Sequence, residues 1–211
     1  MCKLVNFEQN LDLLEEIPYI KYLDLAIIFY VYLDKKGLEN ASIRIHNNHL
    51  TMWQVTLEEV YKAGIENTPK LLPFKKQSMI DIMKEMMLKD RIVEFEPDVE
   101  AEEVAKMMEE LAGEKDDIPM TVLTNTEKWN GAVVLIYSDY LAEMASKEGK
   151  NLYILPSSIH ECIVIYEEAD MSVGKLEEMV KEVNETQVER EEILSNHVYY
   201  FDLKTKELTI A

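Results

Sequence analysis

The sequence predicts an α+β fold, in which mixed and largely antiparallel sheets pack against amphipathic helices. Three observations predict this class. Apolar, β-rich segments occur in pairs separated by turn residues, as antiparallel strands require. Other segments carry apolar residues at helical spacing. A share of 47% hydrophobic residues in a chain of 211 is enough to build an ordinary core.

The first part of the chain predicts one short helix and two strands. An amphipathic helix over residues 6–16 should end before Pro18, because the residue preceding a proline is disfavoured in helical geometry. Residues 22–33 are nearly all apolar, aromatic or β-branched, which predicts a central strand covered on both faces, although a buried helix fits the same run. After turn residues at 34–37, the alternation over 41–46 predicts a half-buried strand that pairs with it antiparallel.

Two further helices are predicted before residue 90. Thr56 and Glu59 have capping-box spacing, and the helix they begin should run to about Asn67 before Pro69 stops it. Ser78 is placed to cap a second helix, which carries a methionine-rich stripe at helical spacing. The stripe consists of Met79, Ile82, Met83, Met86 and Met87. It predicts a core face, or an adaptable protein interface if it is exposed.

Residues 94–117 are strongly acidic, with eleven Asp and Glu against two Lys. Apolar residues within the segment keep helical spacing, so we expect an acidic-faced helix over 99–112 and an exposed loop over 113–117. The chain is therefore predicted to form a single domain over residues 1–211, or two lobes of about 1–93 and 118–211 joined by this segment.

The second half predicts a further α+β run. Residues 120–125 and 132–137 are both β-like and flank the turn signal Asn130-Gly131, which predicts a hairpin with a long loop. The remaining expected elements are a helix over 139–147 closed by Gly149, two strands on either side of residues 156–158, a helix over 172–186, and a final hairpin of 198–201 with 208–210.

Charge and composition limit the function. With 41 acidic and 22 basic residues the net charge is −19, which opposes direct nucleic-acid binding and binding to anionic membranes and favours a basic partner surface. The N-terminus lacks a secretion signal, and no apolar run approaches ~18 residues. The two cysteines suit a reducing compartment. We therefore expect a cytoplasmic protein, and no motif predicts a cofactor.

The segment Pro156-Ser-Ser-Ile-His-Glu-Cys162 combines hydroxyls, an imidazole, a carboxylate and a thiol. If residues 159–166 form a strand, His160 and Cys162 share a face about 7 Å apart while Glu161 faces the other side. A catalytic triad is then not formed. Cys162 is predicted to be a buried apolar side chain with a raised thiol pKa, and Ser157 and Ser158 are predicted turn residues. His160 remains a catalytic candidate.

Asp24 and two histidines are the other candidates. A carboxylate inside an apolar strand must pair, protonate or face an opening, which makes Asp24 a candidate catalytic residue. His46 and His49 are three residues apart and are candidate metal ligands, which His160 or His197 could join, with Glu161 or Asp24 completing the set. The alternative is that His46 and His49 are polar residues at the end of a strand.

Five blocks of sequence resemble one known family. They are Cys2-Lys-Leu-Val-Asn-Phe-Glu, Ile17-Pro-Tyr-Ile-Lys-Tyr-Leu-Asp, Ile45-His-Asn-Asn-His-Leu, Asn67-Thr-Pro-Lys-Leu-Leu-Pro and Leu152-Tyr-Ile-Leu-Pro-Ser-Ser-Ile-His-Glu. In this order they resemble the bacterial domain of unknown function family 5688, with a looser similarity to the uncharacterised family 1444. The resemblance implies a cytoplasmic bacterial α+β protein and assigns no activity. Longer members carry an added N-terminal segment, so we expect a short form or the C-terminal portion of a larger plan.

Three functions follow as hypotheses. The leading one is a non-enzymatic module that binds another protein or itself, because the expected strand geometry does not bring the candidate catalytic residues together. The second is an acidic inhibitor that imitates nucleic-acid charge through residues 94–117 and acts on a basic nucleic-acid-binding protein. The third is a hydrolase that uses Asp24, His46, His49 or His160.

Overall fold

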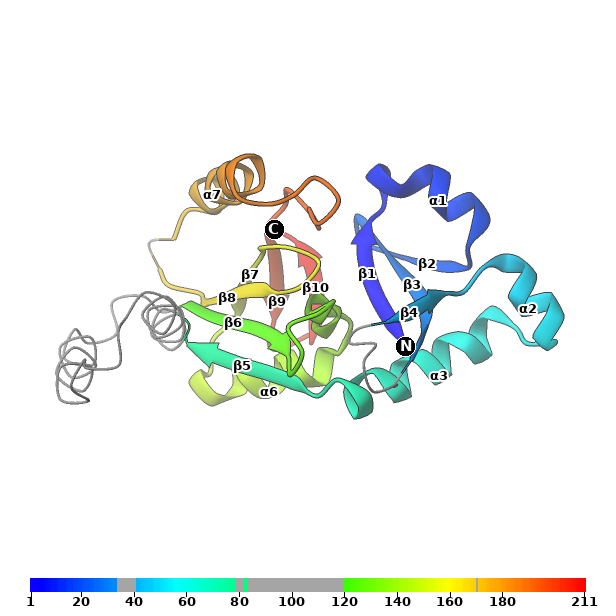
Figure 1. Ribbon diagram of the computed structural model, residues 1–211. Coiled ribbons are helices and arrows are strands. Elements are labelled where there is room, and N and C mark those ends of the chain that lie inside the picture. The colour runs from blue at the N-terminus through cyan, green and yellow to red at the C-terminus, as the bar shows by residue number, and fades with distance from the viewer. Residues whose placement is uncertain (34–40, 79–81, 83–119, 170) are drawn as a thin grey trace, which may run out of the picture.

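A computed structural model of the chain describes residues 1–33, 41–78, 82, 120–169 and 171–211. Within these residues the framework is two antiparallel sheets with helices on their faces, which confirms the α+β class (Figure 1). The predicted methionine-rich stripe, apart from Ile82, and the predicted acidic helix and loop at 94–117 lie outside the described residues.

The first sheet is built around β3 (Leu25–Tyr32), which lies between β1 (Cys2–Asn6) and β2 (Tyr19–Tyr22). A short strand, β4 (Ser42–Arg44), pairs antiparallel with the last three residues of β3, as predicted. Six consecutive side chains at the start of β3 are buried, which accounts for its uninterrupted apolar sequence.

The expected strand over 22–33 begins later than predicted. Leu23 and Asp24 form a two-residue turn between β2 and β3, with Tyr22 paired to Leu25 across it. Leu23 has a φ of 56°, in the left-handed region that a leucine rarely adopts. The prediction that Asp24 lies inside a strand is therefore wrong; its carboxylate projects from a turn, where it can reach a second part of the chain.

Helices cover both faces of the first sheet. On one face, η1 (Glu8–Asn10) and α1 (Leu11–Glu16) pack over a small buried cluster formed by Val5, Leu14, Ile17, Ala26 and Ile28. On the other face, α3 (Leu57–Leu71) contacts β1 and β3, and it follows the short helix α2 (Asn47–Trp53).

The predicted start of α3 is confirmed, and its predicted end is wrong. Thr56 and Glu59 form the capping box: the Glu59 backbone N–H donates to Thr56 Oγ1 over 3.2 Å and the Thr56 N–H donates to Glu59 Oε2 over 2.8 Å. The helix continues through Pro69, which cannot donate to the Ile65 carbonyl four residues earlier. Tyr137 Oη donates to that carbonyl instead, over 2.9 Å, so a tertiary contact replaces the missing helical bond.

The second sheet has six strands in the order β10-β9-β7-β8-β6-β5, all paired antiparallel. Their bounds are β5 (Phe74–Ser78), β6 (Met120–Asn125), β7 (Leu152–Pro156), β8 (Cys162–Tyr166), β9 (Tyr199–Asp202) and β10 (Glu207–Ile210). The strands predicted at 120–125, around 156–158 and at the C-terminus are confirmed. β5 falls within the range expected for a first lobe, yet it pairs with β6.

The apolar segment predicted as the second strand of a hairpin is η2 (Gly131–Ile136), a 3-10 helix. The hairpin prediction is wrong, because β6 pairs with β5 and β8 instead. Its residues from Gly131 to Leu135 are all buried, and a run that is buried on every side has no periodicity that distinguishes a strand from a helix.

Two helices of the second half are confirmed. The first, α6 (Ser138–Glu148), ends at Gly149, whose φ of 65° is the expected left-handed cap. The second, α7 (Val173–Thr186), packs over the second sheet through Leu176 and Val180. In Figure 1, α1 and α7 lie on the upper sides of the two sheets, and α3 and α6 lie below.

The largest buried cluster draws on both sheets. Leu4 and Phe29 of the first sheet belong to it together with Ile154 and Tyr199 of the second, and η2 contributes four residues between them. The two sheets therefore share one apolar core, on which their relative position depends.

We expect Gly131→Ala to destabilise the protein by about 3 kcal/mol, because an added Cβ would lie 2.5 Å from the His160 carbonyl oxygen and 2.8 Å from Thr124 Cα. Urea denaturation measures the change. Gly174→Ala is the matched control, since its Cβ meets nothing nearer than Ser172 Oγ at 3.9 Å. An equal loss in both variants would show that close packing at Gly131 is not the cause.

Candidate functional site

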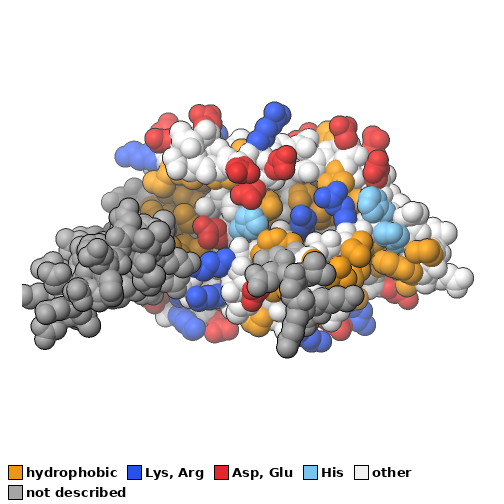
Figure 2. All heavy atoms as spheres, viewed as in Figure 1, with side chains coloured by type: hydrophobic (Ala, Val, Ile, Leu, Met, Phe, Trp, Pro, Cys, Tyr) orange, Lys and Arg blue, Asp and Glu red, His pale blue; other side chains and the backbone are white. Residues whose placement is uncertain are grey.

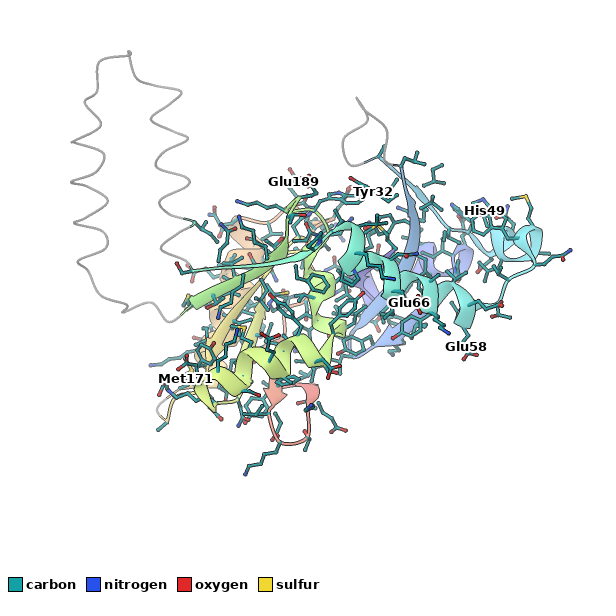
Figure 3. The ribbon with its side chains drawn as sticks, turned by 90° about the horizontal axis from the view of Figure 1, so that it is seen from below. Tyr32, His49, Glu58, Glu66, Met171 and Glu189 are labelled. Carbon is teal, nitrogen blue, oxygen red and sulfur yellow. The ribbon has the colours of Figure 1, made fainter. Side chains whose placement is uncertain are left out.

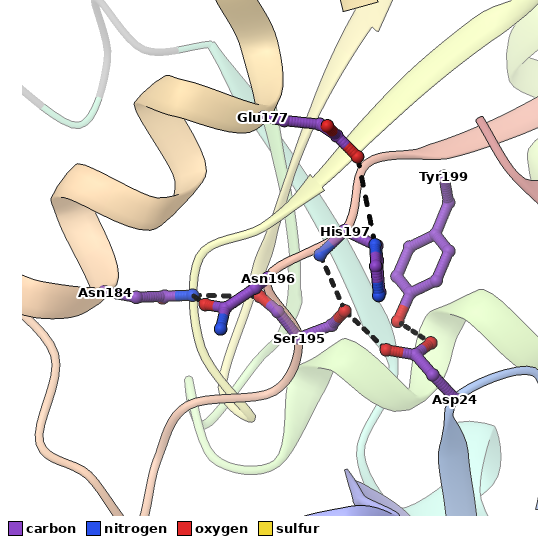
Figure 4. Close-up of polar contacts among 7 residues, drawn as sticks. All are labelled: Asp24, Glu177, Asn184, Ser195, Asn196, His197 and Tyr199. Atoms are coloured by element: carbon purple, nitrogen blue, oxygen red, sulfur yellow. Dashed lines mark hydrogen bonds and ion pairs between the residues drawn. The ribbon is translucent and has the colours of Figure 1, made fainter. Parts of the chain in front are cut away.

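The Asp24 carboxylate is held by two hydroxyl groups from the far end of the chain. Ser195 Oγ donates to Asp24 Oδ2 over 2.6 Å, and Tyr199 Oη donates to Asp24 Oδ1 over 2.7 Å (Figure 4). Ser195 and Tyr199 are both fully buried. Asp24 is therefore stabilised by hydrogen bonds to Ser195 and Tyr199. These bonds join the β2–β3 turn to β9.

The same contacts hold the segment between α7 and β9. Ser195 Oγ accepts a hydrogen bond from the His197 backbone N–H over 2.9 Å. Asn184 on α7 donates through Nδ2 to the Ser195 carbonyl at 2.9 Å and to Asn196 Oδ1 at 2.8 Å. These bonds satisfy polar groups that burial would otherwise leave unpaired, so the network is a structural connection between the two sheets.

Asp24, Ser195 and His197 have the residue types of a hydrolase triad but not its geometry. A serine nucleophile needs an imidazole that accepts its hydroxyl proton. Here the Ser195 proton goes directly to Asp24, and His197 approaches Ser195 only through its backbone. The His197 ring instead lies with Nδ1 3.8 Å from Glu177 Oε1 (Figure 4). This arrangement does not activate Ser195, which is also closed to solvent.

His160 lies in a loop rather than in a strand. The predicted strand over 159–166 starts only at Cys162, so His160 and Cys162 do not share a strand face. His160 Nδ1 accepts the Asn130 backbone N–H over 3.1 Å, and Nε2 lies 3.2 Å from Glu192 Oε1. Because Nδ1 accepts, the neutral ring carries its proton on Nε2 and donates it to Glu192. Both ring nitrogens are engaged, which leaves none to act as a general base.

The loop around His160 is fixed by short-range bonds. Ser158 Oγ accepts the His160 N–H over 3.0 Å, as expected of a turn residue, and Thr124 Oγ1 donates to the His160 carbonyl over 2.8 Å. His160 is thereby placed at the wall of a cavity of about 720 Å³, between the α1 side of the first sheet and the loops of the second. Figure 2 shows basic, histidine and acidic side chains gathered along the middle of this face.

His46 and His49 bracket the start of α2, which the sequence did not predict. The His46 backbone N–H donates to His49 Nδ1 over 3.1 Å. The His49 ring stacks on Trp53, with centroids 5.1 Å apart and 22° between the planes. The described part of the chain contains no group of three or more His, Cys, Asp or Glu side chains that could hold a metal ion. The pair therefore fixes the first turn of α2 and the orientation of Trp53.

The cysteines are buried and unpaired. Cys162 is fully buried in β8, and burial raises the pKa of its thiol, as predicted. Burial likewise raises the pKa of Cys2 to about 11. Both thiols are thus protonated near neutral pH, which is the inert state of a structural cysteine.

An apolar groove of about 390 Å³ lies between β3, α2 and α3. Its apolar wall includes Val31, Ile45, Trp53, Val60 and Leu71. Ile43 is the cross-strand partner of Val31 and lies beside it on the same face of the sheet. We name these six residues the apolar groove. The groove was not predicted from the sequence, because it depends on α2 and on the extension of α3 to Leu71, and neither of these was expected.

Together these features define an α+β protein with a ligand-sized cavity and an apolar groove, whose candidate catalytic residues are engaged in structural contacts. The chain belongs to the family of unknown function 5688 (DUF5688), whose model matches residues 1–203. A similarity to family 1444 is not shown. No curated protein and no solved structure matches the chain. No helix among the described residues is long and apolar enough to cross a membrane.

Burial, and then the charge of Asp24, raise the pKa of Tyr199 far above its usual value near 10. The folded state therefore keeps Tyr199 neutral where the unfolded chain ionises, so the stability it contributes is complete below about pH 10 and falls as pH rises further. We expect Tyr199→Phe to cost about 1–2 kcal/mol at pH 8. That difference from the wild type should shrink by about 1 kcal/mol by pH 11.

Ser195→Ala is the control for this titration, because it also removes one donor to Asp24 but no group that ionises in this range. Its cost should stay constant between pH 8 and pH 11 in urea denaturation. A Tyr199→Phe difference that does not change with pH would contradict the assignment.

Proposed function

We propose that this protein binds another protein through the apolar groove. The main observation in support is that exposed apolar side chains cluster there. Of the eight large apolar residues that are exposed in the described part of the chain, four belong to the groove, with exposed fractions of 40% to 53%. They are Val31, Ile43, Trp53 and Leu71. Scattered apolar residues are normal on a protein surface, whereas a contiguous cluster is typical of an interaction site.

The local structure supports a preformed site. Val31 and Ile43 are direct cross-strand neighbours, so their side chains leave the sheet on the same face. Trp53 is held by its stack on His49, and a tryptophan of fixed orientation is the kind of residue that contributes most to protein interfaces. Binding there would order few side chains, which lowers its entropic cost.

The acidic character of the protein favours a basic partner. Glu59 lines the groove, and Glu58 and Glu66 are exposed on α3, which Figure 3 shows from below. Lys62 and Lys70 are also exposed on α3, so the helix itself is only slightly acidic. The whole chain carries a net charge of −19. The partner we propose therefore presents an apolar segment flanked by lysine or arginine, and its association should weaken at high salt.

The hydrolase and acidic-inhibitor hypotheses have less support. Asp24, His160 and the pair His46 and His49 each have separate partners, so no common observation favours a hydrolase. The acidic-inhibitor hypothesis depends on residues 94–117, which lie outside the described residues. A cytoplasmic location remains part of the proposal, supported by two free thiols.

We expect Ile43→Glu and Leu71→Glu to weaken partner binding at least about tenfold, since each places a carboxylate in an apolar contact. The partner is first captured from the native host and identified, and its affinity is then measured with both proteins purified. Both positions are more than half exposed, so the variants should keep the wild-type unfolding midpoint.

Ile210→Glu and Met179→Glu are matched controls, because Ile210 lies on the edge strand β10 and Met179 on the helix α7, with exposed fractions of 41% and 42%. Both should bind the partner as the wild type does. Binding that survives the two groove variants, or that falls equally in the controls, would reject the groove. Self-association lost only in the groove variants would identify a second copy as the occupant and overturn the basic partner.

A further inference from the structure

The cavity beside His160 concentrates positive charge in an acidic protein. Lys3, Arg44 and Arg190 all line it, although basic residues number 22 against 41 acidic ones in the chain. The strand register explains how the first two meet: Lys3 pairs with Ile28 and Arg44 pairs with Tyr30, and these two β3 residues project to the same face. None of the three cations forms a salt bridge with a described residue.

Holding these cations together opposes stability. Burial and the neighbouring charge of Arg44 both lower the pKa of Lys3, which shows that the ammonium group is partly desolvated and repelled. A surface under selection for stability alone would place a carboxylate between them. The two carboxylates that line this cavity are Glu191 and Glu192, and Glu192 is engaged by His160.

Asn130 also lines the cavity, but its side-chain amide is buried. The residue is only 2% exposed, its Nδ2 is closed to solvent, and the Tyr30 phenol interacts with this side chain. Its backbone N–H donates to His160 Nδ1 over 3.1 Å, so Asn130 helps to hold the imidazole at the cavity wall.

The turn that carries Asn130 is rigid. Asn125 is buried, and its Oδ1 accepts the backbone N–H groups of Glu127 and Trp129 while its Nδ2 donates to the Trp129 carbonyl over 2.7 Å. The Trp129 ring also lines the cavity, and it packs edge-on against Tyr30 with centroids 5.3 Å apart. Part of the cavity wall is therefore aromatic and fixed in place.

We propose that this cavity binds a phosphate-bearing small organic molecule. Lys3, Arg44 and Arg190 supply donors for a phosphate group, whose charge of nearly −2 suits several cations better than a single carboxylate does. Trp129, Ile28 and Ile159 supply an apolar wall for the organic part. The cavity of about 720 Å³ is of the size that encloses such a ligand. Glu192, paired with His160, is placed to accept from a ligand hydroxyl.

Phenyl phosphate is the probe. Inorganic phosphate and phenol, which each represent one part of it, are tested separately for comparison. Trp53→Phe leaves Trp129 as the only tryptophan of the two in the chain, so its fluorescence reports binding in this cavity. We expect phenyl phosphate to bind saturably and more tightly than inorganic phosphate, and phenol not to bind. Added salt should weaken binding, as for any ligand held by charge.

Lys3→Gln and Arg44→Gln should each lower the affinity for phenyl phosphate about tenfold, by removing a charge-assisted contact. Lys175→Gln, at an exposed position on α7 outside the cavity, is the control and should bind as before. Arg190→Gln, in an exposed loop, is a further test should either strand variant fail to fold. Without ligand, Arg44→Gln should unfold at the same temperature as the wild type or higher, because a like charge beside Lys3 is gone.

Three results would overturn the proposal: no saturable binding of phenyl phosphate by folded protein at millimolar concentration, unchanged affinity in the cavity variants, or equal affinity for phenyl phosphate and inorganic phosphate. The groove variants Ile43→Glu and Leu71→Glu should keep the ligand affinity. This separates a failure here from a failure of the protein-binding proposal.

Discussion

The pairing of Asp24 with Ser195 and Tyr199 determines how the rest of the structure is arranged. Asp24 lies in a turn of the first sheet, and both donors precede or begin β9 of the second. Asp24 is half-buried, and moving one sheet past the other would break both of its charge-assisted hydrogen bonds, each contributing roughly 1.5–3 kcal/mol, together with the apolar core that the sheets share. The left-handed backbone at Leu23 is the local cost of aiming Asp24 at these groups.

The cavity and the groove both depend on this fixed arrangement. The cavity takes Lys3 and Arg44 from the first sheet and His160, Trp129 and Arg190 from loops of the second, so it exists only while the sheets hold their relative position. The groove lies within the first sheet and its helices, but α3 is itself tied to the second half by the Tyr137 bond to the Ile65 carbonyl. Contacts made for stability thus position both proposed binding surfaces.

The sequence predicted elements where one local signal decides the structure. The capping box at Thr56, the left-handed glycine at 149 and the strands of the C-terminal hairpin are all confirmed, since each depends on residues close in the chain. The errors have a tertiary origin. Pro69 stays helical because Tyr137 satisfies the freed carbonyl, and residues 131–136 coil into η2 because burial on all sides erased their periodicity. The partners of Asp24 lie about 170 residues away, beyond any spacing argument.

The net charge of the whole chain does not describe the charge at each part of its surface. A total of −19 argues against binding an extended phosphate backbone, because many phosphates would face many carboxylates. A single phosphate in a partly open cavity meets mainly the groups that line it, since solvent and salt screen the remaining charges within about 8–10 Å. Around this cavity the local balance favours cations, because Lys3, Arg44 and Arg190 face the two carboxylates of Glu191 and Glu192. The acidic exterior would then exclude nucleic acid while leaving the cavity open to a small phosphorylated molecule. The same acidic exterior attracts the basic partner proposed for the groove.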